Sequence, residues 1–304
     1  MAMQIDLPSI PLQQIQDKLI ASQGLNIYLL RTDLNHPHIS GNKLYKLKYN
    51  LQAAARCNKQ VLITFGGAFS NHIAAVAAAG KTYGFKTVGI IRGEEYQPLN
   101  PTLQFAADQG MELEYVMRDL YRQKELLLKY VQEKFGTNFF LIPEGGSNEL
   151  GVEGCKEIVK QIPIPFDHIC CSCGTGTTLT GIILSIQHTQ KAMGFQVLKA
   201  PHYIQGEVSR QLETAGHQKS NWCVFDNYHF DGYAKIKAEL MAFIEEFESR
   251  HRIPLDPVYT GKMMFGLYDL IRQGYFKNGE TIVAVHTGGL QGKALQPWQF
   301  TGSC

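Results

Sequence analysis

Residues 40–47 read Ser40-Gly41-Asn42-Lys43-Leu44-Tyr45-Lys46-Leu47, and no other stretch says as much about the fold and chemistry of this chain. Small residues precede Lys43, and apolar residues recur at helical spacing through 43–57, so we expect this lysine at the start of an amphipathic helix. A lysine amine that is positioned and kept neutral can attack an aldehyde and hold it covalently. Alone, a lysine that opens a helix is more often an ordinary surface residue. The stretch therefore predicts a covalent aldehyde cofactor only in the company of other binding motifs.

The rest of the chain alternates short apolar runs with segments of helical period. Several runs are apolar at nearly every position, which is typical of strands covered on both faces and predicts mostly parallel sheets with flanking helices. We therefore expect an α/β protein with two interleaved three-layer domains, the larger from residues 1–45 plus 149–304 and the smaller from 46–148. The predicted strands are 26–30, 61–64, 87–91, 112–116, 139–142, 168–173, 196–200, 222–225 and 281–286; the predicted helices are 43–57, 71–84, 122–135, 151–161, 178–188, 234–250 and 263–273.

Composition excludes several classes of function. The net charge of the 304 residues is +2, and the basic residues are scattered, so neither a nucleic-acid nor a membrane partner is expected. No apolar run approaches the ~20 residues of a membrane span, and the first residues lack the layout of a secretory signal, so a cytoplasmic location is expected. The seven cysteines form no regular framework. Cys170 and Cys173 have Cys-x-x-Cys spacing, but no second pair or histidine completes a zinc set, so buried thiols are favoured over a metal site there or at His36 and His38.

Two glycine-rich segments combine a strand end with hydrogen-bonding residues at a helix start. In Phe65-Gly66-Gly67-Ala68-Phe69-Ser70-Asn71-His72, Ser70 is a natural N-cap and the helix start favours a carboxylate or phosphate. The segment Cys173-Gly174-Thr175-Gly176-Thr177-Thr178 offers close backbone approach and hydroxyl donors, which is typical of a cup for a phosphate monoester. Leu179 breaks a dinucleotide fingerprint, and the chain has no Walker A lysine motif. A capped helix explains Ser70 but not the three successive hydrogen-bonding side chains, whereas a glycine-rich turn with threonine caps explains the second segment equally well when it is taken alone.

Two later segments are further candidates for ligand binding. Asp256-Pro257-Val258-Tyr259-Thr260-Gly261-Lys262 brings an aromatic ring and a hydroxyl to a turn that starts a helix. Ala284-Val285-His286-Thr287-Gly288-Gly289 ends a strand, and such ends line the ligand crevice of open α/β sheets. Taken singly, a capped helix with a core tyrosine and an ordinary strand-ending turn are the more common explanations.

These five segments, in this order, resemble the fold type II (tryptophan synthase β-like) pyridoxal-phosphate enzymes over about residues 10–289. They are most similar to the group that contains 1-aminocyclopropane-1-carboxylate (ACC) deaminase and D-cysteine desulfhydrase. The resemblance implies pyridoxal 5'-phosphate as the cofactor, bound in the larger domain, a small amino acid as the substrate, and a homodimer. It implies catalytic roles for Lys43, Ser70, Tyr259 and Tyr233; cofactor contacts from Lys43, Asn71, Gly174, Thr175, Gly176, Thr177, Thr178, Tyr259, Thr260 and Thr287; and substrate contacts from Ser70, Asn71 and His72.

Three positions favour one side of this group. ACC deaminases carry glutamate where this chain has Thr260, leucine where it has Thr287, and glutamine where it has His72, so it resembles the desulfhydrases more closely. The expected reaction is α,β-elimination from D-cysteine to pyruvate, ammonia and hydrogen sulfide. ACC deaminase, a β-replacing synthase and a non-catalytic ligand-binding protein remain as alternatives. The chain departs from the family at Tyr45, Lys48 and Ser40, where arginine, glutamate and glycine are usual.

Overall fold

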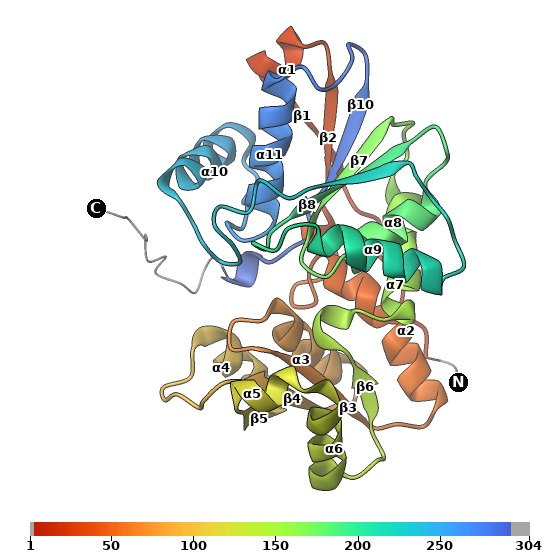
Figure 1. Cartoon of the computed structure of the whole chain (residues 1–304), viewed down its shortest axis with the longest axis vertical. Helices are drawn as coiled ribbons and strands as arrows, with labels where there is room; N and C mark the ends of the chain where they lie inside the picture. The colour runs from red at the N-terminus through yellow and green to blue at the C-terminus, as the bar shows by residue number, and fades with distance from the viewer. Residues whose placement is uncertain (1–2, 293–304) are drawn as a thin grey trace.

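The computed structural model describes residues 3–292 and contains two sheets, each covered by helices (Figure 1). The larger sheet has the strand order β1-β2-β10-β7-β8-β9, and the smaller has the order β5-β4-β3-β6. All neighbouring strands are parallel except β1 and β2. The prediction of an α/β fold with mostly parallel sheets is therefore confirmed.

The elements follow one another in a regular strand and helix alternation. The strands are β1 (Leu12–Ile15), β2 (Asn26–Leu30), β3 (Val61–Gly67), β4 (Lys86–Arg92), β5 (Met111–Val116), β6 (Phe140–Ile142), β7 (His168–Cys173), β8 (Lys191–Gln196), β9 (Trp222–Phe225) and β10 (Thr281–Val285). The helices are α1 (Lys18–Ser22), α2 (Asn42–Arg56), α3 (Asn71–Tyr83), α4 (Pro101–Asp108), α5 (Arg118–Arg122), α6 (Lys124–Phe135), α7 (Glu149–Cys155), α8 (Thr177–Ser185), α9 (Tyr203–Thr214), α10 (Ala238–His251) and α11 (Thr260–Arg272). Short 3-10 turns are η1 (Thr32–Leu34), η2 (Glu144–Gly146), η3 (Lys156–Gln161) and η4 (Leu290–Gly292).

One predicted strand is wrong. The strand expected at 196–200 lies earlier, at Lys191–Gln196, where it pairs in parallel with β7 and β9. Its polar ends and Gly194 hide the apolar pattern. The residues that follow form a turn, because the Gln196 amide donates hydrogen bonds to the Leu198 and Ala200 carbonyls at 2.9 and 2.7 Å. The sequence analysis also missed β1, α1, α4, α5 and α9.

The larger sheet is buried on both faces. Along β2, Ile27 and Leu29 pack in a core with Met263 of α11, whereas Leu30 packs in a second core with Ile182 of α8. Alternating side chains of one strand thus enter two helix layers, as a three-layer arrangement requires.

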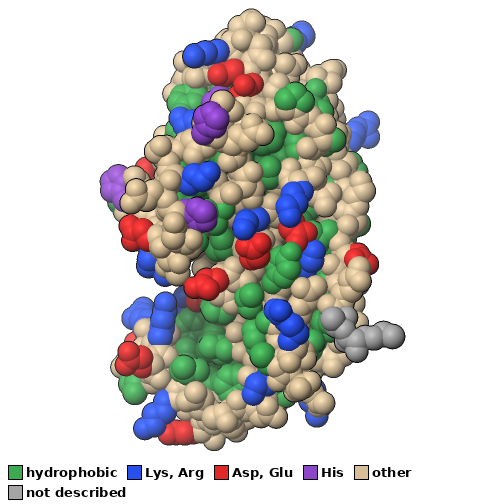
Figure 2. Space-filling view, turned by 90° about the vertical axis from the view of Figure 1, so that its right-hand side faces the viewer, with side chains coloured by type: hydrophobic (Ala, Val, Ile, Leu, Met, Phe, Trp, Pro, Cys, Tyr) green, Lys and Arg blue, Asp and Glu red, His purple; other side chains and the backbone are tan. Residues whose placement is uncertain are grey.

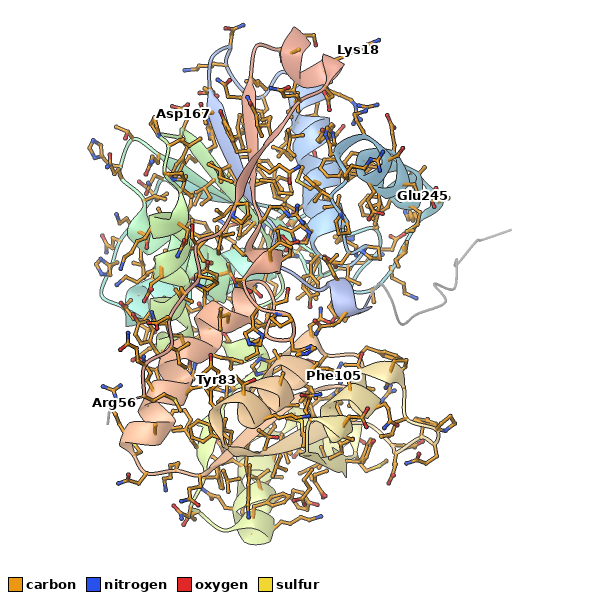
Figure 3. All side chains as sticks on the ribbon, turned by 180° about the vertical axis from the view of Figure 1, so that it is seen from behind. Lys18, Arg56, Tyr83, Phe105, Asp167 and Glu245 are labelled. Carbon is orange, nitrogen blue, oxygen red and sulfur yellow. The ribbon has the colours of Figure 1, made fainter. Side chains whose placement is uncertain are left out.

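Helix α2 lies between the two sheets. Leu44, Leu47 and Leu51 belong to the core of the smaller sheet, while Tyr45 belongs to a core of the larger one. Figure 3 shows α2 running from the middle of the molecule to Arg56 at its far end. The predicted domain boundary at 45/46 therefore falls inside a helix that packs on both sides, and the division into two domains stays a prediction.

Other features of the chain agree with an ordinary buried core. Cys170, Cys171 and Cys173 are buried free thiols of β7, as predicted. Within residues 3–292, no cluster of three or more metal-binding side chains exists, and no helix is long and apolar enough to cross a membrane. The space-filling view shows a notch between the upper and lower parts of the molecule, with basic and acidic side chains gathered beside it (Figure 2).

Candidate active site

A glycine turn places Lys43 at the end of β10. Gly41 has a φ of +71°, and a Cβ on it would lie 2.1 Å from the Thr287 carbonyl oxygen, so only glycine fits there. The next amide, of Asn42, donates to the same carbonyl at 3.2 Å. The segment before α2 is thereby fastened to the residues that follow β10, and Lys43 sits in the first turn of α2.

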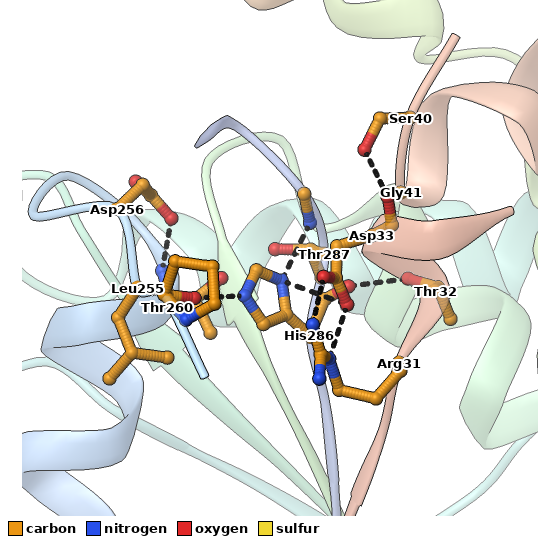
Figure 4. A network of polar contacts seen from close by, with 12 residues as sticks. Arg31, Thr32, Asp33, Ser40, Gly41, Leu255, Asp256, Thr260, His286 and Thr287 are labelled. Carbon is orange, nitrogen blue, oxygen red and sulfur yellow. Dashed lines mark hydrogen bonds and ion pairs between the residues drawn. The ribbon is translucent and has the colours of Figure 1, made fainter. Parts of the chain in front are cut away.

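A buried polar network supports this turn from below (Figure 4). Arg31 donates two hydrogen bonds to the Asp33 carboxylate, at 2.9 and 2.7 Å, and the Ser40 hydroxyl donates to the Asp33 carbonyl at 2.9 Å. His286 Nδ1 lies 3.7 Å from the same carboxylate. These contacts fix the geometry of the lysine turn from three separate segments of the chain.

The Lys43 amine lies in a setting that favours its neutral form. It is half-buried, and Nζ donates to Asn42 Oδ1 at 2.8 Å, while the Asn42 amide donates to Thr178 Oγ1 at 2.9 Å. Burial, together with the nearby Lys46 cation, lowers the pKa of Lys43 to about 7, against smaller opposing effects of Cys155 and Asp256. An amine with such a pKa is a competent nucleophile near neutral pH.

The predicted phosphate cup lies next to this amine. Gly176 adopts the left-handed conformation, with a φ of +76°, and precedes α8. A chain of hydroxyls follows: Thr175 and Thr177 lie 3.1 Å apart, and Thr177 donates to Ser147 at 2.9 Å. Lys46, which the sequence analysis did not assign, completes the cup, because its Nζ donates to the Gly145 carbonyl at 3.0 Å and to Thr175 Oγ1 at 3.4 Å.

The predicted carboxylate loop begins at Ser70, which caps α3. Its Oγ accepts from the amides of His72 and Ile73, at 3.2 and 3.4 Å, and its own hydrogen is left to donate elsewhere. Asn71 reaches across to the segment after β10, since its Nδ2 lies 3.1 Å from the Cβ position of Gly289. Both side chains therefore lie at the mouth of a helix whose free N–H groups attract anions.

His72 is a hydrogen-bond donor to Thr64 in this arrangement. It is 3% exposed, and its Nε2 lies 2.8 Å from Thr64 Oγ1, which donates its own hydrogen to the Ile142 carbonyl at 2.8 Å. Nε2 must then carry the proton, and Nδ1 is left without a partner among residues 3–292. Burial and the Lys43 and Lys46 cations hold the pKa of His72 well below its usual value. Its side chain thus brings no positive charge to the loop.

The tyrosine segment is held by Asp256. The Asp256 carboxylate accepts from the amides of Val258, Tyr259 and Thr260 at 3.0, 2.7 and 2.9 Å. Tyr259 donates to the Tyr233 hydroxyl at 3.2 Å. Burial raises the pKa of Tyr259 well above its usual range.

Gly174 packs closely against the ring of Tyr259, since a Cβ on Gly174 would lie 3.3 Å from Tyr259 Cε1. The Thr260 hydroxyl is fully buried and has no partner within residues 3–292. Thr287 lies 2.8 Å from the Ser172 hydroxyl, also buried. An unpartnered buried hydroxyl is costly unless a ligand satisfies it.

These groups fit pyridoxal phosphate. The cofactor needs an amine for its aldehyde, donors for its phosphate and a polar partner for its ring nitrogen, and Lys43, the Lys46-threonine cup and Thr260 supply these types of group. A family model described as pyridoxal-phosphate dependent enzyme matches residues 7–288. The chain belongs to this family.

Within this family, the chain is similar to proteins named for ACC deaminase and D-cysteine desulfhydrase activities. It is 34% identical to a Thermotoga maritima protein named provisionally as ACC deaminase, over 97% of this chain and 98% of that protein. It is 30% identical to the mitochondrial bifunctional D-cysteine desulfhydrase/ACC deaminase of Arabidopsis thaliana, over 88% of this chain and 73% of that protein. A crystal structure of an ACC deaminase homologue superposes with a TM-score of 0.82 at 29% identity, covering 94% of this chain and 91% of that one. The predicted family and cofactor are therefore confirmed.

The structure brings together nearly all the residues that the motifs suggested. Tyr233 is the most open of them, with 45% of its surface exposed. Two of the departures from the family pattern lie on the side of α2 that faces α7 and η3: the main chain of Tyr45 contacts Gly154, and Lys48 forms an ion pair with Glu157 at 3.0 Å. Lys48 thus packs the helix rather than contributing to the cup.

Proposed function

We propose that the enzyme catalyses α,β-elimination from a small amino acid, with D-cysteine and water giving pyruvate, ammonia and hydrogen sulfide. Pyridoxal phosphate, when bound, supplies an electron sink for the charge left on Cα. The observation that carries the proposal is the buried, unpartnered hydroxyl of Thr260. A carboxylate at that position would hold the ring nitrogen protonated and deepen the sink, whereas a neutral hydroxyl does so less. This suits loss of a good leaving group from Cβ better than opening of a cyclopropane ring.

We assign the proton chemistry to Lys43 and the tyrosines. Lys43, whose pKa is about 7, anchors the cofactor, and its released Nζ takes the α-proton as a general base. Tyr259 keeps its phenolic proton because its pKa is raised, so it can hold a proton beside the departing thiolate instead of acting as a base. Tyr233 shares that proton through their hydrogen bond.

We assign the substrate carboxylate to the Ser70 loop. The Ser70 hydroxyl and the Asn71 amide are donors at the helix mouth, and the main-chain dipole adds to their attraction. His72 contributes through its position in the loop, since its side chain is neutral and its Nε2 proton is engaged by Thr64.

ACC deamination is the second candidate, because the names of the Thermotoga and Arabidopsis relatives include that activity. Assays of ammonia, keto acid and sulfide with D-cysteine, L-cysteine and ACC separate the two. We expect turnover of D-cysteine to exceed that of ACC, and the Thr260→Glu variant to shift the ratio toward ACC. Comparable turnover of ACC and D-cysteine by the natural enzyme would contradict the assignment.

A non-catalytic binding protein is the third candidate. It would bind the cofactor or its analogues without consuming any of the three amino acids. Lys43→Ala is the control, since this variant should lose the yellow colour of the covalently bound cofactor. Retained colour in Lys43→Ala would refute the anchor assignment, whatever the substrate proves to be.

A further inference from the structure

Lys262 is a buried cation whose partners are two main-chain carbonyls. It lies in the first turn of α11 and is 0% exposed. Its Nζ donates to the carbonyls of His229 and Gly232, both at 2.8 Å, and it forms no ion pair within residues 3–292. Burial lowers the pKa of Lys262 to about 8, with Asp256 opposing the shift, so the amine is still mainly protonated at neutral pH. Hydrogen bonds from a charged donor are the strong ones.

The two carbonyls belong to a loop in a sparsely populated conformation. Phe230, Asp231 and Ala234 have φ values of 51°, 69° and 55°, in the left-handed region that non-glycine residues seldom adopt. Such a conformation persists only where the surroundings hold it in place. Phe230 helps by packing edge-to-face on Phe265 of α11, with ring centroids 4.9 Å apart.

The same loop carries a residue of the active site. Tyr233 directly follows Gly232, and its hydroxyl accepts from Tyr259, which precedes α11. The start of α11 therefore positions both tyrosines. Tyr259 directly precedes the helix in the chain, and Lys262 in its first turn binds the loop that carries Tyr233.

We propose that Lys262 is a positioning residue, whose ammonium group fastens the 229–234 loop and thereby sets the Tyr233 hydroxyl against Tyr259. The catalytic part of this inference rests on the proposed function of the two tyrosines. The contact between Lys262 and the loop does not depend on that function.

Lys237, the N-cap of α10, offers a matched control because it also binds the 229–234 loop. Lys237 forms an ion pair with Asp231 at 2.8 Å, but both side chains are about half exposed. Exposed pairs of this kind contribute little. Lys262→Met and Lys237→Met thus remove the same group, one from a buried site and one from the surface.

The first measurement is hydrogen exchange of the holoenzyme. We expect Lys262→Met to speed exchange of the 229–236 amides by about tenfold or more, with the strands of both sheets unchanged, and Lys237→Met to leave the loop near its natural rate. Unchanged loop exchange, or an equal rise throughout the molecule, would overturn the proposal. If Lys262→Met does not fold, Lys262→Gln, which keeps two donor hydrogens without the charge, takes its place with a smaller rise expected.

The second measurement is a double-mutant cycle in the elimination assay. If Lys262 acts through Tyr233, kcat/KM of Lys262→Met/Tyr233→Phe should lie within about twofold of Tyr233→Phe alone, because the two losses share one cause. Losses that multiply would mean that Lys262 has only a general structural role. A fully active Tyr233→Phe would refute the role of the tyrosine and leave hydrogen exchange to decide on Lys262.

Discussion

Replacing Lys46 by methionine should weaken binding of the cofactor without weakening the protein. Lys46 is 4% exposed, and its cation has neutral partners, the Gly145 carbonyl at 3.0 Å and Thr175 Oγ1 at 3.4 Å. A phosphate in the threonine cup would supply the missing countercharge. A charge-assisted hydrogen bond contributes about 1.5–3 kcal/mol, so we expect affinity for pyridoxal phosphate to fall roughly 10- to 150-fold.

Whereas affinity for the cofactor should fall in Lys46→Met, the stability of the apoenzyme should be unchanged or higher. Burial lowers the pKa of Lys46, so below that pKa the folded state holds a cation at a cost that the unfolded chain does not bear. Between the lowered pKa and the ordinary value of 10.5, the unfolded state binds more protons, and stability of the natural apoenzyme rises with pH. Lys46→Met removes this cost, so its melting temperature at neutral pH should be unchanged or higher, and the rise with pH should be smaller.

Absorbance titration of the apoenzyme with pyridoxal phosphate and with pyridoxal gives the decisive comparison. Pyridoxal lacks the phosphate, so Lys46→Met should bind it as tightly as the natural enzyme does. Lys48→Met, on the same helix but paired with Glu157, is the matched control and should bind both ligands normally. Equal loss of affinity for both ligands would mean that Lys46 acts on the helix and not on the phosphate.

Three further results are expected. Ser70→Ala should lower kcat at least about tenfold with little change in cofactor affinity, and should cost about 1 kcal/mol of stability as a lost N-cap; an unaffected rate would leave Ser70 as a cap only. The rate of cofactor recombination with the apoenzyme should rise about tenfold per pH unit up to about 7, the pKa of Lys43, and then level off; a rise continuing to pH 10 would show an ordinary lysine. Arg31→Met leaves the buried Asp33 carboxylate unpaired, so urea unfolding should show a loss of about 3–5 kcal/mol, and a loss below about 1 kcal/mol would contradict that account.

The sequence predicts most strands because apolar runs leave a local signal, and β8 is missed because its polar ends and Gly194 hide that signal. The antiparallel edge strand carries even less of it. Strand β1 is four residues long, pairs antiparallel with β2 and buries only Ile15, so its two glutamines read as a loop. Helix α4 had a readable start, since Asn100 caps it and Pro101 occupies its first turn, and that signal was overlooked.

The site is predictable where one segment carries a whole function, as in the Ser70 loop and the threonine cup. It is not predictable where distant segments meet. Lys46 lies three residues after Lys43, which puts both on one side of a helix. That it reaches the Gly145 carbonyl and the Thr175 hydroxyl depends on loops far along the chain. The tautomer of His72 likewise depends on Thr64 and on a carbonyl of β6.

Lys43 and Lys46 repel one another electrostatically in the apoenzyme. Both amines are buried near one another, both pKa values are lowered by burial, and the charge of Lys46 lowers that of Lys43 further. On the proposed assignment a single ligand would relieve both, since Lys43 would hold its aldehyde and Lys46 would neutralise its phosphate. Replacing either lysine removes the repulsion between the two amines, and it also removes one of the two groups proposed to bind the cofactor. The two positions should therefore be coupled in cofactor affinity, with the double variant losing less than the product of the single losses.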